Sequence, residues 1–135
     1  MSPTSKQSTM AAQTEADLVS ARHLARSYAK DLGLGLVDET KLVTAVSELT
    51  RNLIVHGGGG SVFIERIDEV SRHGIRAVFE DHGPGIANIN LAMMDGHSST
   101  KSLGLGLPGS KRLVSEFQID SEAGKGTRVT ITKWK

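Results

Sequence analysis

The chain has 135 residues, a length that fits one domain built around a single hydrophobic core. Its 16 Lys and Arg nearly balance 15 Asp and Glu, which argues against nucleic-acid binding through bulk charge. The absence of cysteine excludes disulfide scaffolds, thiolate zinc sites, iron–sulfur clusters and cysteine nucleophiles. Because neither a secretory signal pattern nor a run of about 20 apolar residues is visible, we expect a cytoplasmic protein.

The N-terminal third predicts a tail and two helices. Residues 1–13 are rich in Ser, Thr and Gln, so we expect a disordered tail there and one folded domain over residues 14–135. A capping-box pattern at residues 14–17 and an apolar stripe up to Leu32 predict a helix that ends before Gly33. We expect Asp38 to cap a second helix, which ends at residue 56 before four consecutive glycines.

The remainder of the chain alternates between strand and helix signals. Period-two alternation predicts strands at residues 61–67 and 75–80, with a turn between them. We then expect a short helix at residues 88–94 and a long polar and Gly-rich loop at residues 95–107. Another helix should follow at residues 108–117, and a final hairpin should have its strands at residues 117–121 and 127–134. This order predicts an α+β two-layer sandwich, with helices on one face of a mixed, mostly antiparallel sheet.

Three short patterns carry candidate chemistry, and the first lies on the second helix. Glu48 and Asn52 are four residues apart and therefore share one face, away from the apolar stripe of that helix. An Asn oxygen can ligate Mg²⁺, and a carboxylate can accept a proton from a hydroxyl nucleophile. A solvated helix face with an ordinary polar pair would show the same spacing.

The second pattern follows the second predicted strand. Asp81 could accept a hydrogen bond from an exocyclic amine such as that of adenine, and Gly83 and Gly85 would let the backbone pass close to a flat ring. An ordinary turn has the same composition. Thr127 begins the last strand, where its hydroxyl could support Asp81 if the two strands are neighbours.

The third pattern is the glycine-rich segment at residues 104–109, which opens a helix. It matches G-x-G-x-x-G, but it does not follow a strand at the start of a βαβ unit, so we reject a dinucleotide-binding interpretation. Exposed backbone N–H groups at such a helix start can bind phosphate, and residues 98–101 add hydroxyls and a cation. A flexible linker remains the alternative.

The order of these patterns resembles the Bergerat, or GHKL, ATP-binding fold of gyrase, Hsp90, histidine kinases and MutL. The chain is most similar to the small RsbT-type switch kinases of stressosomes, which act in stress response. By this resemblance Glu48 is the catalytic base, Asn52 the Mg²⁺ ligand and Asp81 the adenine anchor. The resemblance also implies ATP contacts from Gly83, Gly85, Ile86 and Thr127, from His56 next to the second helix, and from a lid comprising Ser98, Ser99, Thr100, Lys101, Gly104, Leu105, Gly106 and Leu107.

The resemblance implies an ATP- and Mg²⁺-dependent serine/threonine kinase that phosphorylates STAS-domain proteins. It also implies that the released kinase binds and activates a PP2C-type phosphatase, with no nucleic-acid or membrane partner. Two alternatives stay open: an anti-sigma kinase that sequesters a sigma factor, and a binding module without catalysis. The presence of Glu48, Asn52 and Asp81 together favours an active enzyme.

Overall fold

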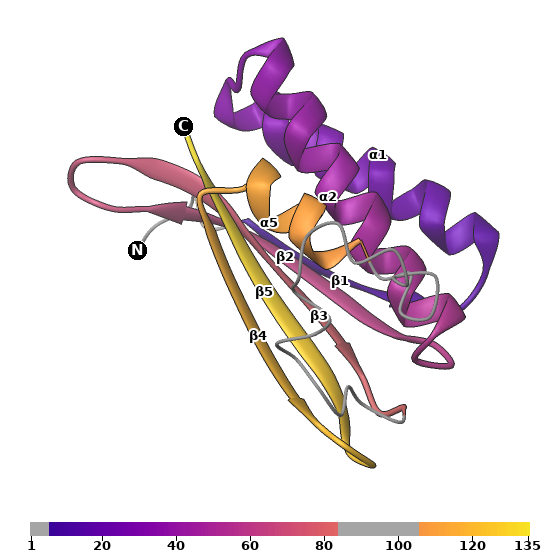
Figure 1. Ribbon diagram of the computed structural model, residues 1–135. Coiled ribbons are helices and arrows are strands. Elements are labelled where there is room, and N and C mark those ends of the chain that lie inside the picture. The colour runs from indigo at the N-terminus through magenta and orange to yellow at the C-terminus, as the bar shows by residue number, and fades with distance from the viewer. Residues whose placement is uncertain (1–5, 84–105) are drawn as a thin grey trace.

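A computed structural model describes residues 6–83 and 106–135 (Figure 1). Their elements are, in chain order, β1 (Gln7–Ala12), α1 (Glu15–Leu32), α2 (Leu36–Val55), β2 (Gly60–Asp68), β3 (His73–Asp81), α5 (Leu107–Leu113), β4 (Glu116–Glu122) and β5 (Gly126–Trp134). The strands of these residues form one sheet in the order β1-β2-β3-β5-β4, and every neighbouring pair is antiparallel.

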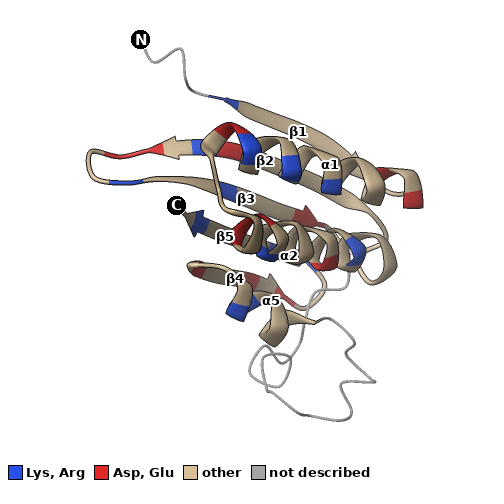
Figure 2. Cartoon of the chain, turned by 90° about the horizontal axis from the view of Figure 1, so that it is seen from above, with Lys and Arg blue, Asp and Glu red and all other residues tan. Residues whose placement is uncertain are grey.

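The fold has two layers. Within the described residues, helices α1, α2 and α5 lie on one face of the sheet and no helix covers the other face, as Figures 1 and 2 show. The core between the layers is made by apolar side chains that alternate along the strands, such as Ile64, Ala77 and Ile131, packed against the helix stripes. The expected α+β sandwich is therefore confirmed.

Helix α1 begins and ends where its sequence predicts. The Thr14 hydroxyl accepts a hydrogen bond from the Asp17 N–H at 3.2 Å, and the Asp17 carboxylate accepts one from the Thr14 N–H at 3.1 Å. This reciprocal capping box satisfies donors that the first turn leaves open. Gly33 ends the helix in the left-handed region (φ 84°), which is easily reached by glycine.

Helix α2 begins earlier than expected, so the prediction that Asp38 caps it is wrong. Gly35 occupies the N-cap position and makes no side-chain cap. Asp38 and Glu39 lie in the first turn instead, where negative charge interacts favourably with the helix dipole. The helix runs on to Val55, and His56 follows as its C-cap.

The predicted N-terminal tail is wrong for residues 7–12, which form β1. This strand pairs with β2 over six residues, from Gln7 opposite Glu65 to Ala12 opposite Gly60. A side-chain contact also holds β1 against α1, because the Ser8 hydroxyl is hydrogen-bonded to the Tyr28 hydroxyl at 2.8 Å. The order in this polar segment comes from backbone pairing and these contacts, which composition does not reveal.

The C-terminal elements are shorter or longer than expected at their ends. Helix α5 ends at Leu113, earlier than expected. Strand β4 begins at Glu116, which pairs with Thr132 of β5. The expected helix at residues 88–94 and most of the expected loop at residues 95–107 lie outside the described residues. No helix in the described part of the chain is long and apolar enough to cross a membrane.

Candidate nucleotide-binding site

Helix α2 carries the first two candidate residues on one face. Glu48 and Asn52 are half-buried, one helical turn apart. Glu48 lies against Gly106, at the start of α5, since a Cβ on Gly106 would stand 3.0 Å from the Glu48 Oε2 atom. The carboxylate is thus placed beside the glycine that closes the predicted lid segment. Gly106 has a φ of 63°, so a side chain there would be strained as well as crowded.

The end of α2 meets the end of β3 through close backbone approach. Asp81 is 8% exposed, and its Oδ1 atom accepts a hydrogen bond from the Gly83 N–H at 2.8 Å. Gly57 leaves room for this carboxylate, because a Cβ there would stand 2.5 Å from the Asp81 Oδ2 atom. Gly83 in turn packs on Gly57, since a Cβ on Gly83 would stand 2.6 Å from the Gly57 carbonyl oxygen.

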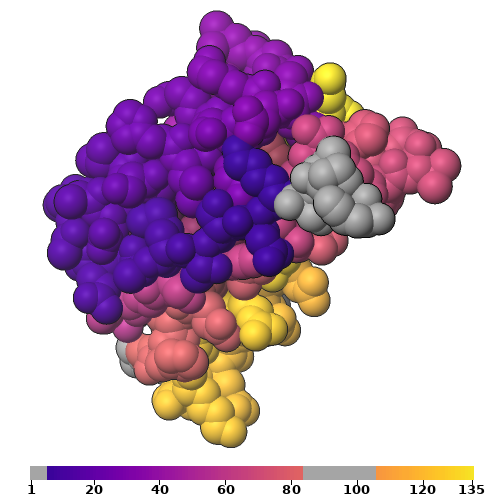
Figure 3. Space-filling view, turned by 180° about the vertical axis from the view of Figure 1, so that it is seen from behind, coloured from indigo at the N-terminus to yellow at the C-terminus, as the bar shows by residue number. Residues whose placement is uncertain are grey.

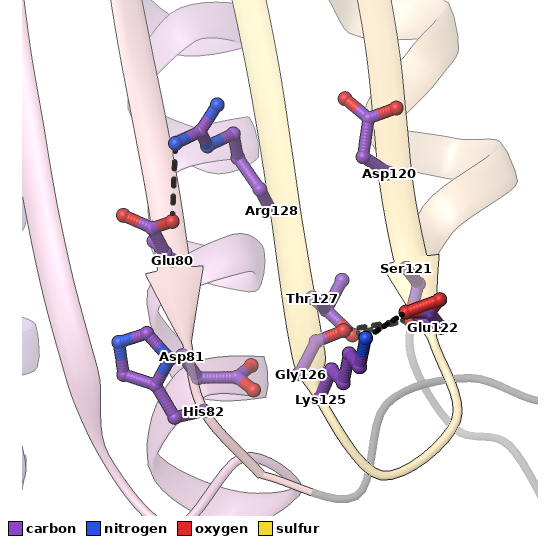
Figure 4. A pocket seen from close by; sticks show the side chains of 10 residues that line it. All are labelled: Glu80, Asp81, His82, Asp120, Ser121, Glu122, Lys125, Gly126, Thr127 and Arg128. Carbon is purple, nitrogen blue, oxygen red and sulfur yellow. Dashed lines mark hydrogen bonds and ion pairs between the residues drawn. The ribbon is translucent and has the colours of Figure 1, made fainter.

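A pocket of about 390 Å³ opens beside Asp81 at this end of the sheet (Figure 4). Its walls come from the ends of β3, β4 and β5, and its lining is mostly polar: Glu80, Asp81, His82, Asp120, Ser121, Glu122, Lys125, Gly126, Thr127 and Arg128. Gly126 allows its strand to approach β3, since a Cβ there would stand 2.2 Å from the Asp81 carbonyl oxygen. A flat polar ligand could therefore lie at the sheet end in contact with both strands.

Thr127 lies beside Asp81 in this pocket, because β3 and β5 are neighbours as the prediction required. The Thr127 hydroxyl is hydrogen-bonded to the Ser121 hydroxyl at 2.8 Å, and Ser121 also donates to the Gly126 carbonyl at 3.1 Å. These hydrogen bonds tie Thr127 to β4, and Thr127 lies next to Asp81 in the pocket wall without a direct hydrogen bond between their side chains. Its supporting role stays a prediction.

The other predicted contacts differ in how they are placed. The His56 residue is exposed at the end of α2, and its backbone N–H donates a hydrogen bond to the Asn52 backbone carbonyl at 3.0 Å. Leu107 is 1% exposed and packs in the core, so only its backbone remains for a cofactor. The predicted contacts Gly85, Ile86, Ser98, Ser99, Thr100, Lys101, Gly104 and Leu105 lie outside the described residues.

Sequence reasoning did not assign Gly57 or Gly126 to the site, although the Gly124–Thr127 pattern contains Gly126. Gly57 belongs to a run of four glycines that reads as a loop after α2, and Gly126 reads as part of a hairpin turn. Their role depends on which backbone lies opposite each of them, and that is a tertiary property. The repeated use of glycine where α2, β3 and β5 converge was the available signal.

The residues present fit a magnesium nucleotide better than a metal held by protein alone. In residues 6–83 and 106–135, no three His, Asp or Glu side chains are grouped to hold an ion by themselves. Magnesium usually keeps several waters and is bound by one or two protein oxygens together with phosphates. Asn52 could supply such an oxygen, and the pocket of about 390 Å³ beside Asp81 has room for a ring at the sheet end.

Comparison with known proteins agrees with this geometry. Residues 37–135 match the family model of histidine kinase-, DNA gyrase B- and HSP90-like ATPases. The chain is 45% identical over 128 residues to the serine/threonine-protein kinase RsbT of Bacillus subtilis, covering 95% of this chain and 96% of that protein. It is also 32% identical to an anti-sigma F factor of Clostridium kluyveri, covering 84% and 82% of the two chains, and 36% identical to that of Clostridium beijerinckii, covering 72% of each.

The similarity to RsbT extends over nearly the whole of both chains, including the part that carries Glu48, Asn52 and Asp81. This identity places the chain among enzymes of the protein kinase type. The two-layer fold, the convergence of α2 with β3 and β5, and the family match lead to one assignment. The chain belongs to the family of histidine kinase-, DNA gyrase B- and HSP90-like ATPases.

Proposed function

We propose that this chain is a Mg²⁺- and ATP-dependent serine/threonine kinase of a partner-switching module, with STAS-domain proteins as substrates. The observation that carries the proposal is the line of groups along one side of the molecule. Glu48 lies beside Gly106, Asn52 follows one turn later, and Asp81 lies against the loop that ends α2. A nucleotide anchored at Asp81 and extending along α2 would bring its terminal phosphate toward Glu48.

The proposed step is an in-line phosphoryl transfer. A substrate hydroxyl oxygen bonds to the γ-phosphorus, the bond from that phosphorus to the β–γ bridging oxygen breaks, and ADP leaves. The hydroxyl proton passes to the Glu48 carboxylate, which also orients the hydroxyl. Magnesium held at Asn52 would neutralise charge on the phosphates. Most of the rate enhancement would come from positioning and charge neutralisation.

We extend the proposal to partners. In this scheme a STAS-domain antagonist of a stressosome holds the kinase, phosphorylation releases it, and the free kinase binds and activates a PP2C-type phosphatase. The similarity to RsbT supports this reading. The choice between partners is then a competition of affinities. A second candidate, sequestration of a sigma factor, is favoured by the relatives named anti-sigma F factors.

A pull-down with the purified chain separates the two partner schemes. Capture of a STAS protein and a phosphatase, with release of the STAS protein after ATP is added, supports the switch kinase. Capture of a sigma factor instead supports the second candidate. Stoichiometric capture without any transfer would contradict the kinase proposal.

The nucleotide site is tested with Asn52→Ala in titration calorimetry. We expect wild-type protein to bind ATP more tightly with Mg²⁺ than with EDTA, because the Asn52 oxygen contributes to the Mg²⁺ site. Asn52→Ala should lose that Mg²⁺ dependence, with affinity in Mg²⁺ reduced about tenfold or more. Thr44→Ala, an exposed position of the same helix, is the matched control and should bind like wild type. Unchanged affinity in Asn52→Ala would remove Asn52 from the metal site.

A further inference from the structure

Helix α5 lies beside α2 and runs in the opposite direction (Figures 1 and 2). Its N-cap, Gly106, lies against Glu48 in the second half of α2. Its last residue, Leu113, accepts a hydrogen bond from the Lys133 amine, which also lies 3.3 Å from Asp38 in the first turn of α2. The two helices therefore share one surface, which extends from the start of α2 to the candidate base.

Three exposed basic residues lie on these two helices: Lys41 and Arg51 on α2, and Lys111 on α5. Lys41 precedes Glu48 by seven residues and Arg51 follows it by three, so these three residues lie along one stripe of α2. Lys111 adds a positive charge on the neighbouring helix. The candidate base thus has positive charge before it and after it on α2, and beside it on α5.

These three cations have no ion pair with any other residue that the structure describes. Oppositely charged side chains one turn apart on a helix commonly pair, but the two acids at that spacing have other contacts. Asp38, one turn before Lys41, is paired with Lys133. Glu48, one turn before Arg51, lies against Gly106. The charge of this surface is therefore available to a partner.

Cations on other surfaces of the described chain have acidic partners. On α1, which forms much of the surface seen from behind in Figure 3, Arg26 and Lys30 share the Glu39 carboxylate at 3.4 and 3.6 Å. On the sheet, Arg76 pairs with Glu65 at 3.5 Å. A group of cations without acidic partners is thus a specific property of the surface formed by α2 and α5.

The placement of these cations favours a protein partner over the nucleotide. Arg51 directly precedes Asn52, so its side chain leaves the helix about 100° away from that of Asn52. Lys41 lies about 10 Å along the helix axis from Glu48, on the side away from Asn52. A nucleotide that extends from Asp81 to Glu48 would end before Lys41. A protein that presents a hydroxyl to Glu48 would cover this surface.

We propose that Lys41, Arg51 and Lys111 form a basic docking surface for an acidic region of the protein substrate, next to the hydroxyl that is phosphorylated. Complementary charge would speed the encounter and orient the hydroxyl toward Glu48. The delivery of the hydroxyl rests on the proposed kinase function. The binding of an acidic protein surface does not depend on it, so the two proposals can fail separately.

The first test measures binding without phosphoryl transfer, in the presence of Mg·ADP. The probes are two short fluorescein-labelled peptides with one central Ser, flanked by Glu in one peptide and by Gln in the other. Fluorescence anisotropy should show about tenfold or tighter binding of the Glu peptide at low salt. The difference should shrink as NaCl is added, because salt screens exposed charges. Equal affinities, or no binding of the Glu peptide, would overturn the proposal.

Charge reversals locate the surface on the molecule. Lys41→Glu, Arg51→Glu and Lys111→Glu should each weaken binding of the Glu peptide about fivefold and leave the circular dichroism spectrum unchanged. Lys41→Arg keeps the charge and should bind like wild type. Lys135→Glu makes the same charge change beside Gly33, at the end of α1, and is the matched control. An equal loss of binding in Lys135→Glu would mean unspecific attraction and would contradict the docking surface.

Steady-state transfer to a STAS-domain protein then tests delivery of the hydroxyl. Lys111→Glu should raise KM for the STAS protein about fivefold with little change in kcat, because it removes binding that ground state and transition state share. Its affinity for ATP in calorimetry should equal that of wild type. A loss of ATP affinity would assign Lys111 to the nucleotide and overturn its docking role. Absence of transfer by wild type would contradict the kinase proposal alone, because the peptide measurement needs no transfer.

Discussion

At the scale of single residues, the site depends on glycines, which have no Cβ, as much as on its polar side chains. Asp81 can lie against the loop after α2 only because Gly57 has no Cβ, and Glu48 can lie against α5 only because Gly106 has none. Each glycine thus leaves room for one of the carboxylates that we assign to adenine and to the transferred proton. They are therefore specific test positions.

Gly57→Ala should weaken nucleotide binding while leaving the chain folded. The new Cβ would stand 2.5 Å from the Asp81 Cγ and Oδ2 atoms, so the carboxylate must leave its position. We expect affinity for ATP, measured by calorimetry, to fall about tenfold or more, which corresponds to about 1.4 kcal/mol. Gly35→Ala, at the opposite end of α2, where the new Cβ would meet no atom of another part of the chain within 4 Å, is the control and should bind ATP normally. Equal affinities in both variants would contradict the placement of adenine at Asp81.

At the scale of elements, polar contacts at the ends of helices hold the helix layer in register with the sheet. The capping box fixes the start of α1 directly after β1. Lys133 of β5 is 8% exposed and donates to the Leu113 carbonyl at the end of α5, while its amine lies 3.3 Å from the Asp38 carboxylate. The capping box is local, whereas the Lys133 contacts join elements that are distant in sequence, and the loss of either predicts a measurable loss of stability.

The capping box predicts an acid-sensitive contribution. Hydrogen bonds from the N–H groups of Gln13 and Thr14 lower the pKa of Asp17 below its ordinary 3.8. A carboxylate whose pKa is lower when folded stabilises the fold fully above its unfolded pKa, and this stabilisation is lost as pH falls through the folded pKa. In urea unfolding from about pH 5 downward, wild type should therefore lose stability more steeply than Asp17→Asn.

Two further results constrain this prediction. Thr14→Ala, which removes the hydroxyl half of the box, should cost about 1 kcal/mol at neutral pH. Asp68 will contribute to the acid loss in both proteins, because its hydrogen bond with His73 and its contacts with Arg66 lower its pKa too. Parallel pH profiles for wild type and Asp17→Asn would contradict the assigned role of Asp17.

Lys133→Met should destabilise the fold by about 1–2 kcal/mol, because the partly buried Leu113 carbonyl loses its lysine donor. Asp38 is half-exposed and remains solvated, which limits the cost. Lys125→Met, at an exposed turn, is the control and should change the free energy of unfolding by less than about 0.5 kcal/mol. Similar urea midpoints for the two variants would mean that Lys133 contributes no more than a surface lysine.

At the scale of the whole molecule, the parts of the fold that depend on local pattern could be predicted. The apolar stripes of α1 and α2, the Thr14 cap and the alternation in β2 and β3 all determine elements directly. Strand β1 could not be predicted, since its order comes from pairing with β2 and from contacts to α1. The start of α2 was misplaced because Gly35 caps it without a side-chain bond.

The same division applies to the site. Glu48, Asn52 and Asp81 could be proposed as site residues because they are polar residues in family order along the chain. Gly57 and Gly126 could not be, since only the crossing of α2, β3 and β5 shows which backbone each must accommodate. Leu107 was assigned to the cofactor, yet its side chain completes the core. Sequence therefore identifies the chemical groups, while topology determines which of them meet.

The most direct measurement is transfer of radiolabelled γ-phosphate from Mg·ATP to a STAS-domain protein encoded beside this one. We predict that wild type labels the STAS protein. Glu48→Gln should still bind ATP, but its transfer rate should fall by about 100-fold or more. Glu15→Gln, an exposed position at the start of α1, is the control and should transfer at the wild-type rate. Wild-type transfer by Glu48→Gln, or no transfer by a wild-type protein that binds ATP, would contradict the account.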